Sequence, residues 1–183
     1  PNTNSSTIKV QKRDGRLESL DINKIHFVVE EACEGLTGVS SSQIEMNANI
    51  QFYDGMTTKD IQNVLVRSAN DLITLENPNY QYAAARLLSY DVRKEAHGQY
   101  EYIPLLKLVL RNIRLGVYDK GIVEKYTKTD IKKLNTWIKR DRDLNFTYSG
   151  LRQVVDKYLV QDRSSGQLYE TPQDMYMMIA ATL

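Results

Sequence analysis

Charged residues near the N-terminus have the types and spacing of a phosphate-binding cluster. Lys12-Arg13-Asp14-Gly15 places two cations beside a turn signal, and Lys24 follows further along the chain. Asp21 precedes an apolar helical pattern, so Lys24 is expected in the first turn of a helix, where free N–H groups and the helix dipole favour anions. Glu18 and Asp21 add acceptors for amines, hydroxyls or hydrated Mg²⁺. Two or three cations around a helix N-terminus predict a polyphosphate site.

The same cluster fits a second interpretation, a charged surface hairpin with ordinary ion pairs, because charge runs usually mark a solvated face. The sequence contains neither the glycine-rich dinucleotide fingerprint nor the Walker phosphate loop. A nucleotide site would therefore depend on side-chain cations and helix ends. Thr58 and Arg93-Lys94 are further candidates for it, although a threonine N-cap and cations at a helix C-terminus need no ligand.

Composition excludes several classes of protein. The 183 residues are 42% hydrophobic and 26% charged with a net charge of +1, which indicates one large or two small globular domains and no general attraction to nucleic acid or membrane. Without a long apolar run or a signal peptide, we expect a soluble cytoplasmic protein. One cysteine and two histidines are too few for a structural zinc site or a redox dithiol, so no metal site and no catalytic residue is predicted. Cys33 is interpreted as an inert core thiol, and His26 and His97 as structural.

The elements that must position the cluster begin with a hairpin. Ile8 and Val10 alternate with polar neighbours, Asp14-Gly15 is the turn signal, and residues 16–20 return. Four helices are expected next, because apolar residues recur at helical spacing. Their expected starts are Asp21, a Ser42/Glu45 capping box, Thr57 or Thr58, and Pro78 after Asn77; the first is expected to stop at Gly38 and the fourth near Gly98.

The remainder of the chain is predicted to be mainly helical. Apolar stripes cover residues 105–109, residues 131–138 after a Thr129 cap, and residues 151–158. Residues 158–161 and 167–170 predict a second hairpin. Thr171-Pro172 opens a last helix that is still apolar at Leu183, so we expect the domain to continue beyond this residue.

Two sets of motifs resemble known families. The first set resembles an ATP-cone domain, a regulatory nucleotide module; it consists of Lys12-Arg13-Asp14-Gly15, Glu18, Lys24-Ile25, Gly55-Met56-Thr57-Thr58 and Asp60-Ile61. The second set is similar to class I ribonucleotide reductase large subunits; it consists of residues 80–86, 141–143, 146–150, 157–160 and 169–173. The resemblance implies a mainly α fold. An ATP cone at residues 1–98, with a short β lid over a four-helix bundle, would precede a helical segment with a small β-hairpin at residues 99–183, the start of the reductase domain before its catalytic barrel.

The resemblance also implies roles for individual residues. Lys12 and Arg13 would approach the phosphates of the nucleotide, and Thr58 and Lys94 would make further contacts. The base, ribose and phosphates would be lined by the segment Glu18, Ser19, Leu20, Asp21, Ile22, Asn23 and Lys24. Gln62 stands where bacterial relatives have histidine; it can donate a hydrogen bond but cannot become cationic. A phosphate contact there, and the strength of dATP inhibition, are therefore left open.

The implied function is regulatory. The chain would be the N-terminal portion of a ribonucleoside-diphosphate reductase large subunit, a thioredoxin- or glutaredoxin-dependent enzyme. It would bind ATP or dATP, with Mg²⁺ on the nucleotide, at the overall-activity site. The catalytic cysteines would lie elsewhere, so this part alone should be inactive. Its partners would be the remainder of the large subunit, a second large subunit and the radical-generating small subunit.

Alternatives from other classes remain. An ATP-cone regulatory or nucleic-acid-binding module without a reductase would account for Lys132-Lys133 and Lys139-Arg140, but the family's repressor relatives carry a four-cysteine zinc ribbon, which one cysteine excludes. An anaerobic reductase is disfavoured by the residues that resemble class I enzymes beyond the cone. An independent small enzyme is disfavoured because no nucleophile–base pair or metal-ligand cluster stands out.

Overall fold

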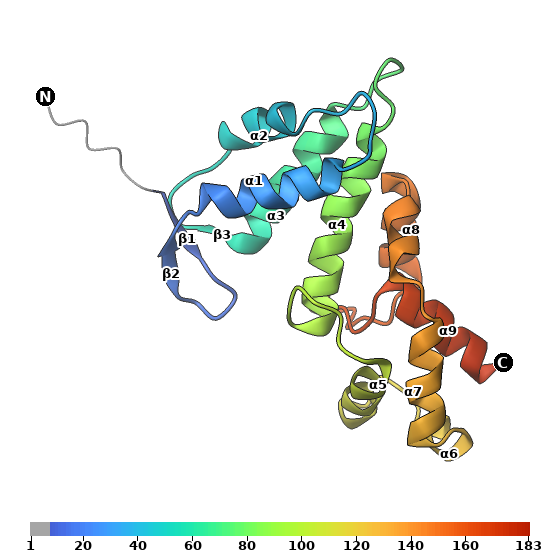
Figure 1. Ribbon diagram of the computed structural model, residues 1–183. Helices are drawn as coiled ribbons and strands as arrows, with labels where there is room; N and C mark the ends of the chain where they lie inside the picture. Colours follow the sequence, from blue (N-terminus) through green and yellow to red (C-terminus); the bar gives the residue numbers. More distant parts are fainter. Residues whose placement is uncertain (1–7) are drawn as a thin grey trace, which may run out of the picture. The chain divides into compact units, whose positions relative to one another are not determined.

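The computed structural model describes residues 8–183 and is mainly helical with one small sheet (Figure 1). The predicted fold class is confirmed. Two compact units divide between Leu88 and Ser89, and helix α4 (Tyr80–His97) contributes residues to both. Residues 1–7, which the sequence assigns to the predicted first domain, lie outside the described residues. No helix within residues 8–183 is both long enough and apolar enough to cross a bilayer.

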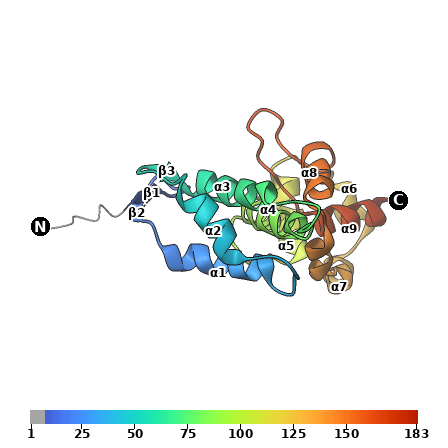
Figure 2. The same cartoon turned by 90° about the horizontal axis from the view of Figure 1, so that it is seen from above.

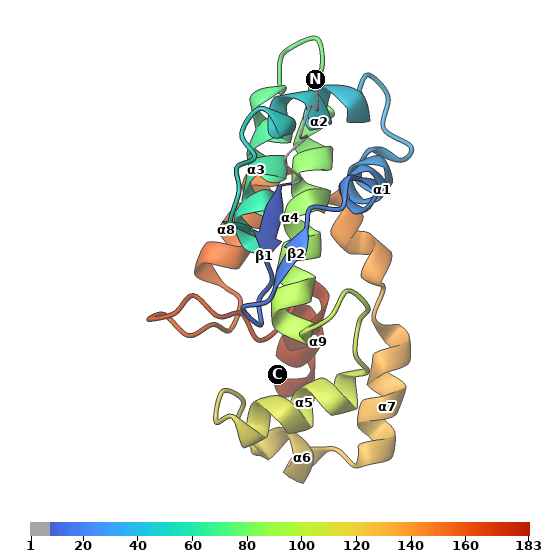
Figure 3. The ribbon, with the colours of Figure 1, turned by 90° about the vertical axis from the view of Figure 1, so that its left-hand side faces the viewer.

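Three short strands form the sheet of the first unit. Strand β1 (Lys9–Gln11) pairs antiparallel with β2 (Leu17–Ser19) and parallel with β3 (Met56–Thr57), so β1 is the central strand. Figure 3 shows β1 and β2 side by side. The predicted hairpin is confirmed, but its loop is longer than two residues, because the Lys12 N–H donates to Arg16 O at 2.8 Å and Gly15 takes a φ of +85°. Strand β3 was not anticipated from the sequence.

The helices of the first unit begin at side-chain caps. Asp21 caps α1 (Ile22–Cys33), Ser40 caps α2 (Ser41–Asn49), and Thr57 caps α3 (Thr58–Asp71). The first helix therefore ends earlier than the expected Gly38, the second is capped two residues before the expected Ser42, and α4 begins two residues after Pro78. The apolar stripes of these helices form the core; its fully buried members include Val29, Ala32, Ile44, Ala48, Ala69, Ala83 and Leu87.

The second unit contains six more helical segments. They are α5 (Leu105–Arg114), α6 (Gly121–Lys125), α7 (Lys128–Trp137), the 3₁₀ helix η1 (Arg140–Asn145), α8 (Tyr148–Lys157) and α9 (Pro172–Thr182). Thr127, not the expected Thr129, caps α7. The predicted second hairpin is reduced to one bridge between Gln161 and Leu168. The core of this unit is built on Ile103, Leu105, Leu108, Val109, Ile122, Ile131 and Ala181.

A buried ionic cluster surrounds the start of α9. The Asp174 carboxylate accepts from the Thr171 N–H at 3.1 Å, lies 3.0 Å from His97 Nε2, and lies 2.6 Å from an Arg140 guanidinium nitrogen. Its side chain and that of His97 are 0% exposed. Burial alone would raise the pKa of Asp174, but the hydrogen bond with His97 and the charge of Arg140 outweigh burial and lower the pKa to about 2. The histidine that the sequence left without a partner is therefore part of the core.

We expect Asp174→Asn to destabilise the protein far more than Asp130→Asn. Both aspartates close the same kind of capping box, at α9 and at α7. Loss of the Asp174 charge removes the carboxylate that pairs with the Arg140 guanidinium, which is only 19% exposed, and should cost about 3–5 kcal/mol. Asp130 is solvent-exposed, and loss of its charge should cost much less. Urea unfolding measures both. Equal losses would mean that capping alone, and not the buried ion pair, makes Asp174 important.

Candidate functional site

The sheet lies at the ends of α1 and α3 where these helices begin (Figures 1 and 2). Two residues separate β2 from α1, and β3 leads directly into α3. A helix N-terminus presents unpaired N–H groups and the positive end of the helix dipole. The sheet therefore brings the hairpin close to two positions that favour negative charge.

Strand register decides which side chains of the hairpin face inward. Val10 pairs with Glu18, and because side chains alternate along a strand, Lys12 shares their face. Val10 is 4% exposed, whereas Leu17 on the opposite face is 62% exposed. Lys12 and Glu18 are diagonal neighbours on the inner face, with side chains that are 31% and 42% exposed and an ion pair of 3.2 Å.

Arg16 extends this ion pair and was missed by the sequence interpretation. It lies 3.9 Å from Glu18 and 2.7 Å from Asp14. Hydrogen bonds from the Arg16 backbone and guanidinium lower the pKa of Asp14 below its ordinary value. Arg16 directly precedes β2, and its spacing of two residues from Glu18 is the signal that could have identified it.

The beginning of α1 holds the second group of predicted site residues. The Asp21 carboxylate accepts from the N–H groups of Asn23 at 3.1 Å and Lys24 at 3.4 Å, which confirms the predicted cap. Lys24 lies in the first turn, as expected, with its ammonium 3.6 Å from Asp21. Ser19 and Ile22 are exposed, as is Asn23, and Leu20 is half-buried. The segment therefore presents polar and charged groups to solvent beside the hairpin.

The beginning of α3 supplies Thr58 and Gln62. Thr57 is the cap, with its hydroxyl oxygen accepting from the Asp60 N–H at 3.0 Å, so Thr58 is the first helical residue and its hydroxyl is not needed as a cap. One turn later, the Gln62 side chain donates to Leu87 O of α4 at 2.7 Å. This amide connects α3 to α4, a contact that the sequence did not reveal.

Two predicted residues are not part of the inner face of the hairpin. Arg13 is exposed in the turn between β1 and β2. Lys94 is exposed in the last turn of α4 and belongs to the second compact unit. The first unit thus brings together the hairpin and the starts of α1 and α3.

Comparisons with known proteins assign the chain to a family. Residues 8–95 match the model of the ATP cone domain, and residues 144–183 match that of the ribonucleotide reductase all-alpha domain. The subunit alpha of ribonucleoside-diphosphate reductase 1 from Salmonella typhimurium is 44% identical over 98% of this chain, and that from Escherichia coli is 43% identical over the same share. The subunit alpha from Enterobacteria phage T4 is 41% identical over 96% of it.

The chain belongs to the ribonucleotide reductase large-subunit family. It corresponds to the N-terminal region with its ATP cone, a nucleotide-binding regulatory domain. It spans about a quarter of the length of the relatives, 24% for those from Salmonella and E. coli and 23% for that from the phage.

Cys33 has the properties of an unreactive thiol. It is the last residue of α1 and is half-buried, and burial raises the pKa of its thiol to about 11. A thiol with this pKa is almost fully protonated at neutral pH, and the thiolate is the reactive form. Within residues 8–183, no three histidine, cysteine or acidic side chains are grouped to hold a metal ion.

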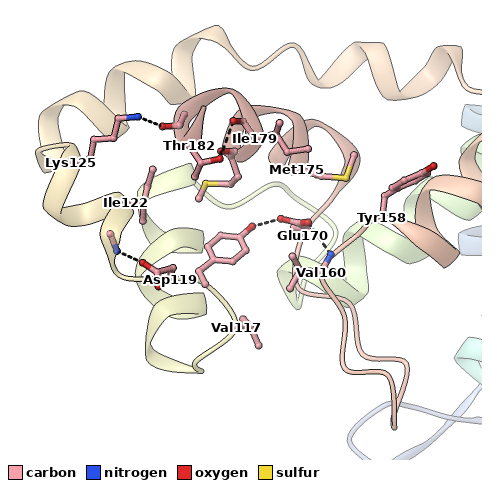
Figure 4. A pocket seen from close by; sticks show the side chains of 14 residues that line it. Val117, Asp119, Ile122, Lys125, Tyr158, Val160, Glu170, Met175, Ile179 and Thr182 are labelled. Atoms are coloured by element: carbon pink, nitrogen blue, oxygen red, sulfur yellow. Dashed lines mark hydrogen bonds between the residues drawn. The ribbon is translucent and has the colours of Figure 1, made fainter.

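Two pockets are lined by none of the predicted effector residues. One, of about 610 Å³, is in the cone and is lined by Phe27, Glu30, Glu31, Cys33, Glu34, Val39 and Ser41. The other, of about 420 Å³, is in the second unit between α6 and α9 (Figure 4). Its wall is mostly apolar, with Met175 and Ile179 on α9, and Tyr118 donates a short hydrogen bond to Glu170 there. The pocket of the second unit therefore resembles a packing surface, and the three glutamates that line the pocket of the cone disfavour a polyphosphate there.

An exposed histidine connects α1 to α2 beside the first of these pockets. His26 Nδ1 lies 2.9 Å from a Glu45 carboxylate oxygen, and Nε2 lies 3.2 Å from Glu30. The hydrogen bond with Glu45 and the charges of both glutamates raise the pKa of His26. The cationic form is therefore favoured in the folded cone.

The contribution of His26 to stability should fall as pH rises. Because its folded pKa is raised, the contribution is complete below the unfolded pKa of about 6.5 and is lost as pH rises through the folded value. The difference in unfolding free energy between the protein and His26→Gln, measured by urea titration from pH 5.5 to 8.5, should shrink with pH. A constant difference would show that the ion pairs do not contribute.

Proposed function

We propose that the cone binds ATP and dATP as Mg²⁺ complexes, at the overall-activity site of a class I ribonucleotide reductase large subunit. One observation carries the proposal. The register of β1 and β2 places Lys12 on the inner face of the hairpin, and the sheet lies at the N-termini of α1 and α3. Cations beside helix N-termini are suited to a polyphosphate, and this chain has no glycine-rich phosphate loop to do the same.

The cations of the site would bind the phosphates. Lys12 and Arg13 would contact them from the hairpin, and Lys24 from the first turn of α1. Thr58 would donate its hydroxyl from the start of α3, and Lys94 would complete the set of contacts. A lysine ammonium or an arginine guanidinium makes charge-assisted hydrogen bonds to phosphate oxygens, which are about twice as strong as neutral ones.

The acceptors beside them would recognise the rest of the nucleotide. Glu18 and Asp21 would accept from the adenine amine or the ribose hydroxyls, or would hold the hydrated Mg²⁺, which prefers oxygen ligands. The stretch that begins at Ser19, exposed except for the half-buried Leu20, would line the base and ribose. Its other members are Leu20, Ile22 and Asn23.

Gln62 would contribute less than a histidine. It cannot become cationic, and its amide already donates to Leu87 O. A direct phosphate contact would require this hydrogen bond to break. We therefore expect dATP to act more weakly here than in a relative with histidine at this position.

Regulation would operate through linked equilibria. ATP and dATP differ by one hydroxyl, so they can have opposite effects only if they bind two quaternary states with different affinities. A coupling free energy of about 1–3 kcal/mol is usual between linked sites. Residues close to the ribose would distinguish ATP from dATP by the presence or absence of the hydroxyl. The segment after Glu18 would therefore decide which quaternary state each nucleotide favours.

The whole enzyme would be a thioredoxin- or glutaredoxin-dependent reductase of ribonucleoside diphosphates. Cys33 is the one cysteine of this chain and is unreactive, so this part alone would not catalyse reduction. The partners would be the remainder of the large subunit, a second large subunit and the radical-generating small subunit. Apolar side chains exposed on α1, on α2 with its C-cap, and on α9 support such contacts; they are Ile22, Phe27, Met46, Ile50, Tyr176 and Ile179.

Calorimetric titration of this chain tests the nucleotide site. ATP and dATP should bind in the presence of Mg²⁺, and GTP should bind much more weakly because it lacks the adenine amine. Lys12→Ala should weaken ATP binding by roughly tenfold or more, since a hydrogen bond to a charged group is worth about 1.5–3 kcal/mol.

Two variants make the titration specific. Lys120→Ala removes an exposed lysine that is paired with Glu124 in the second unit, and it should leave affinity unchanged. Gln62→His should tighten dATP binding at pH 6, where the imidazole is largely cationic. Failure of the folded chain to bind any adenine triphosphate would reject the proposed site.

A chimeric enzyme tests the regulatory role. The matching N-terminal quarter of the Salmonella large subunit is replaced by this chain and assayed with its small subunit. Ribonucleotide reduction should rise with ATP and fall with dATP, because the linkage would be carried by the cone. The overall-activity role would be rejected if the rate of reduction changed with neither nucleotide and if Lys12→Ala also left the rate unchanged.

A further inference from the structure

Three cations of the lid, Lys12, Arg16 and Lys24, are already paired with carboxylates of the same segment. The lid is defined here as residues 9–24, the hairpin and the first turn of α1. The Lys12 ammonium lies 3.2 Å from Glu18, and the Lys24 ammonium lies 3.6 Å from Asp21. Arg16 lies between two carboxylates, Asp14 and Glu18. A phosphate that approaches the lid therefore meets three cations that already have carboxylate partners.

The N-terminus of α1 is occupied in the same way. The Asp21 carboxylate accepts from the N–H groups of Asn23 and Lys24, which are the groups that a phosphate would use at a helix N-terminus. The Asp21 carboxylate thus occupies the position of a bound anion at the helix N-terminus. The Glu18 carboxylate occupies the corresponding position at the Lys12 ammonium. Both carboxylates are partly exposed, with 43% and 42% of their side chains accessible, so solvent can replace either partner.

We propose that Glu18 and Asp21 are internal counterions that a polyphosphate must displace, and that they suppress binding of phosphate groups that arrive without a nucleoside. This inference rests on the proposed nucleotide site. A nucleoside triphosphate offers amine and hydroxyl donors to the released carboxylates. Inorganic triphosphate has no such donors. When it binds, the two released carboxylates would remain unpaired beside its negative charges and would repel it.

The effect should be moderate because the pairs are exposed. Exposed ion pairs in water have small interaction energies, because solvent screens both charges. The repulsion between a freed carboxylate and a multiply charged ligand a few ångströms away is larger than that between single charges, but it is screened by salt. Removal of one carboxylate should therefore tighten inorganic triphosphate binding about three- to tenfold at low salt.

The test measures binding of inorganic triphosphate to the 183-residue chain by calorimetry, at low ionic strength and without divalent ions. Glu18→Gln preserves side-chain size and removes the charge. Asp21→Asn does the same and preserves the helix cap, because asparagine is as good an N-cap as aspartate. Each variant should bind inorganic triphosphate about three- to tenfold more tightly than the unmodified chain, and the gain should diminish in about 0.5 M salt.

Glu124→Gln is the matched control. It removes a carboxylate from a comparable exposed pair with Lys120 at 3.5 Å in the second unit, and so makes the same change in net charge. It should change affinity by less than twofold. Thermal unfolding checks that all three variants remain folded.

The outcomes separate this inference from the proposed function. If the unmodified chain does not bind MgATP, the nucleotide site itself is rejected. If it binds MgATP but Glu18→Gln and Asp21→Asn leave inorganic triphosphate affinity within twofold or lower it, the counterion role is overturned. A gain equal to that of Glu124→Gln would also overturn it, because net charge would then account for the effect.

Discussion

The pairing of β1 on both of its edges is the constraint on which the candidate site depends. Its antiparallel partner β2 leads into α1, and its parallel partner β3 leads into α3. Asp54 reinforces this arrangement, because its carboxylate accepts from the Lys9 N–H at 2.8 Å while the Gly55 N–H donates to Lys9 O. One strand of three residues therefore brings two helix N-termini and the cations of the hairpin to the same end of the cone.

Charged groups serve opposite purposes in the two units. Asp174 is buried with His97 and Arg140, where each charge depends on its partners because water is excluded. In the lid, Lys12 and Glu18 remain accessible, so their pairing contributes little to stability. Ion pairs are therefore buried in the core of the second unit and accessible on the surface of the first.

This division suits a regulatory module. A site that controls a quaternary equilibrium must gain and lose its ligand as nucleotide levels change, so its charges should be exposed and weakly paired. The second unit belongs to the reductase domain of the family over residues 144–183, where a cohesive core is needed instead. Gln62 differs from the exposed, weakly paired groups of the candidate site, because its amide donates to the backbone of α4.

Local features of this chain were readable from the sequence. The hairpin, the Asp21 cap, the Thr171-Pro172 start of α9 and the place of Lys24 depend on interactions within a few residues, so short patterns predict them. The sequence predicted the caps of α2 and α7 two residues too late, at Ser42 and Thr129 instead of Ser40 and Thr127. Several hydroxyl side chains compete for the cap position at those two helix starts. Only the tertiary structure decided that β3 pairs with β1, that Gln62 bonds to α4 and that His97 meets Asp174. These contacts join residues far apart in the chain, where no periodicity or motif records which groups will be brought together.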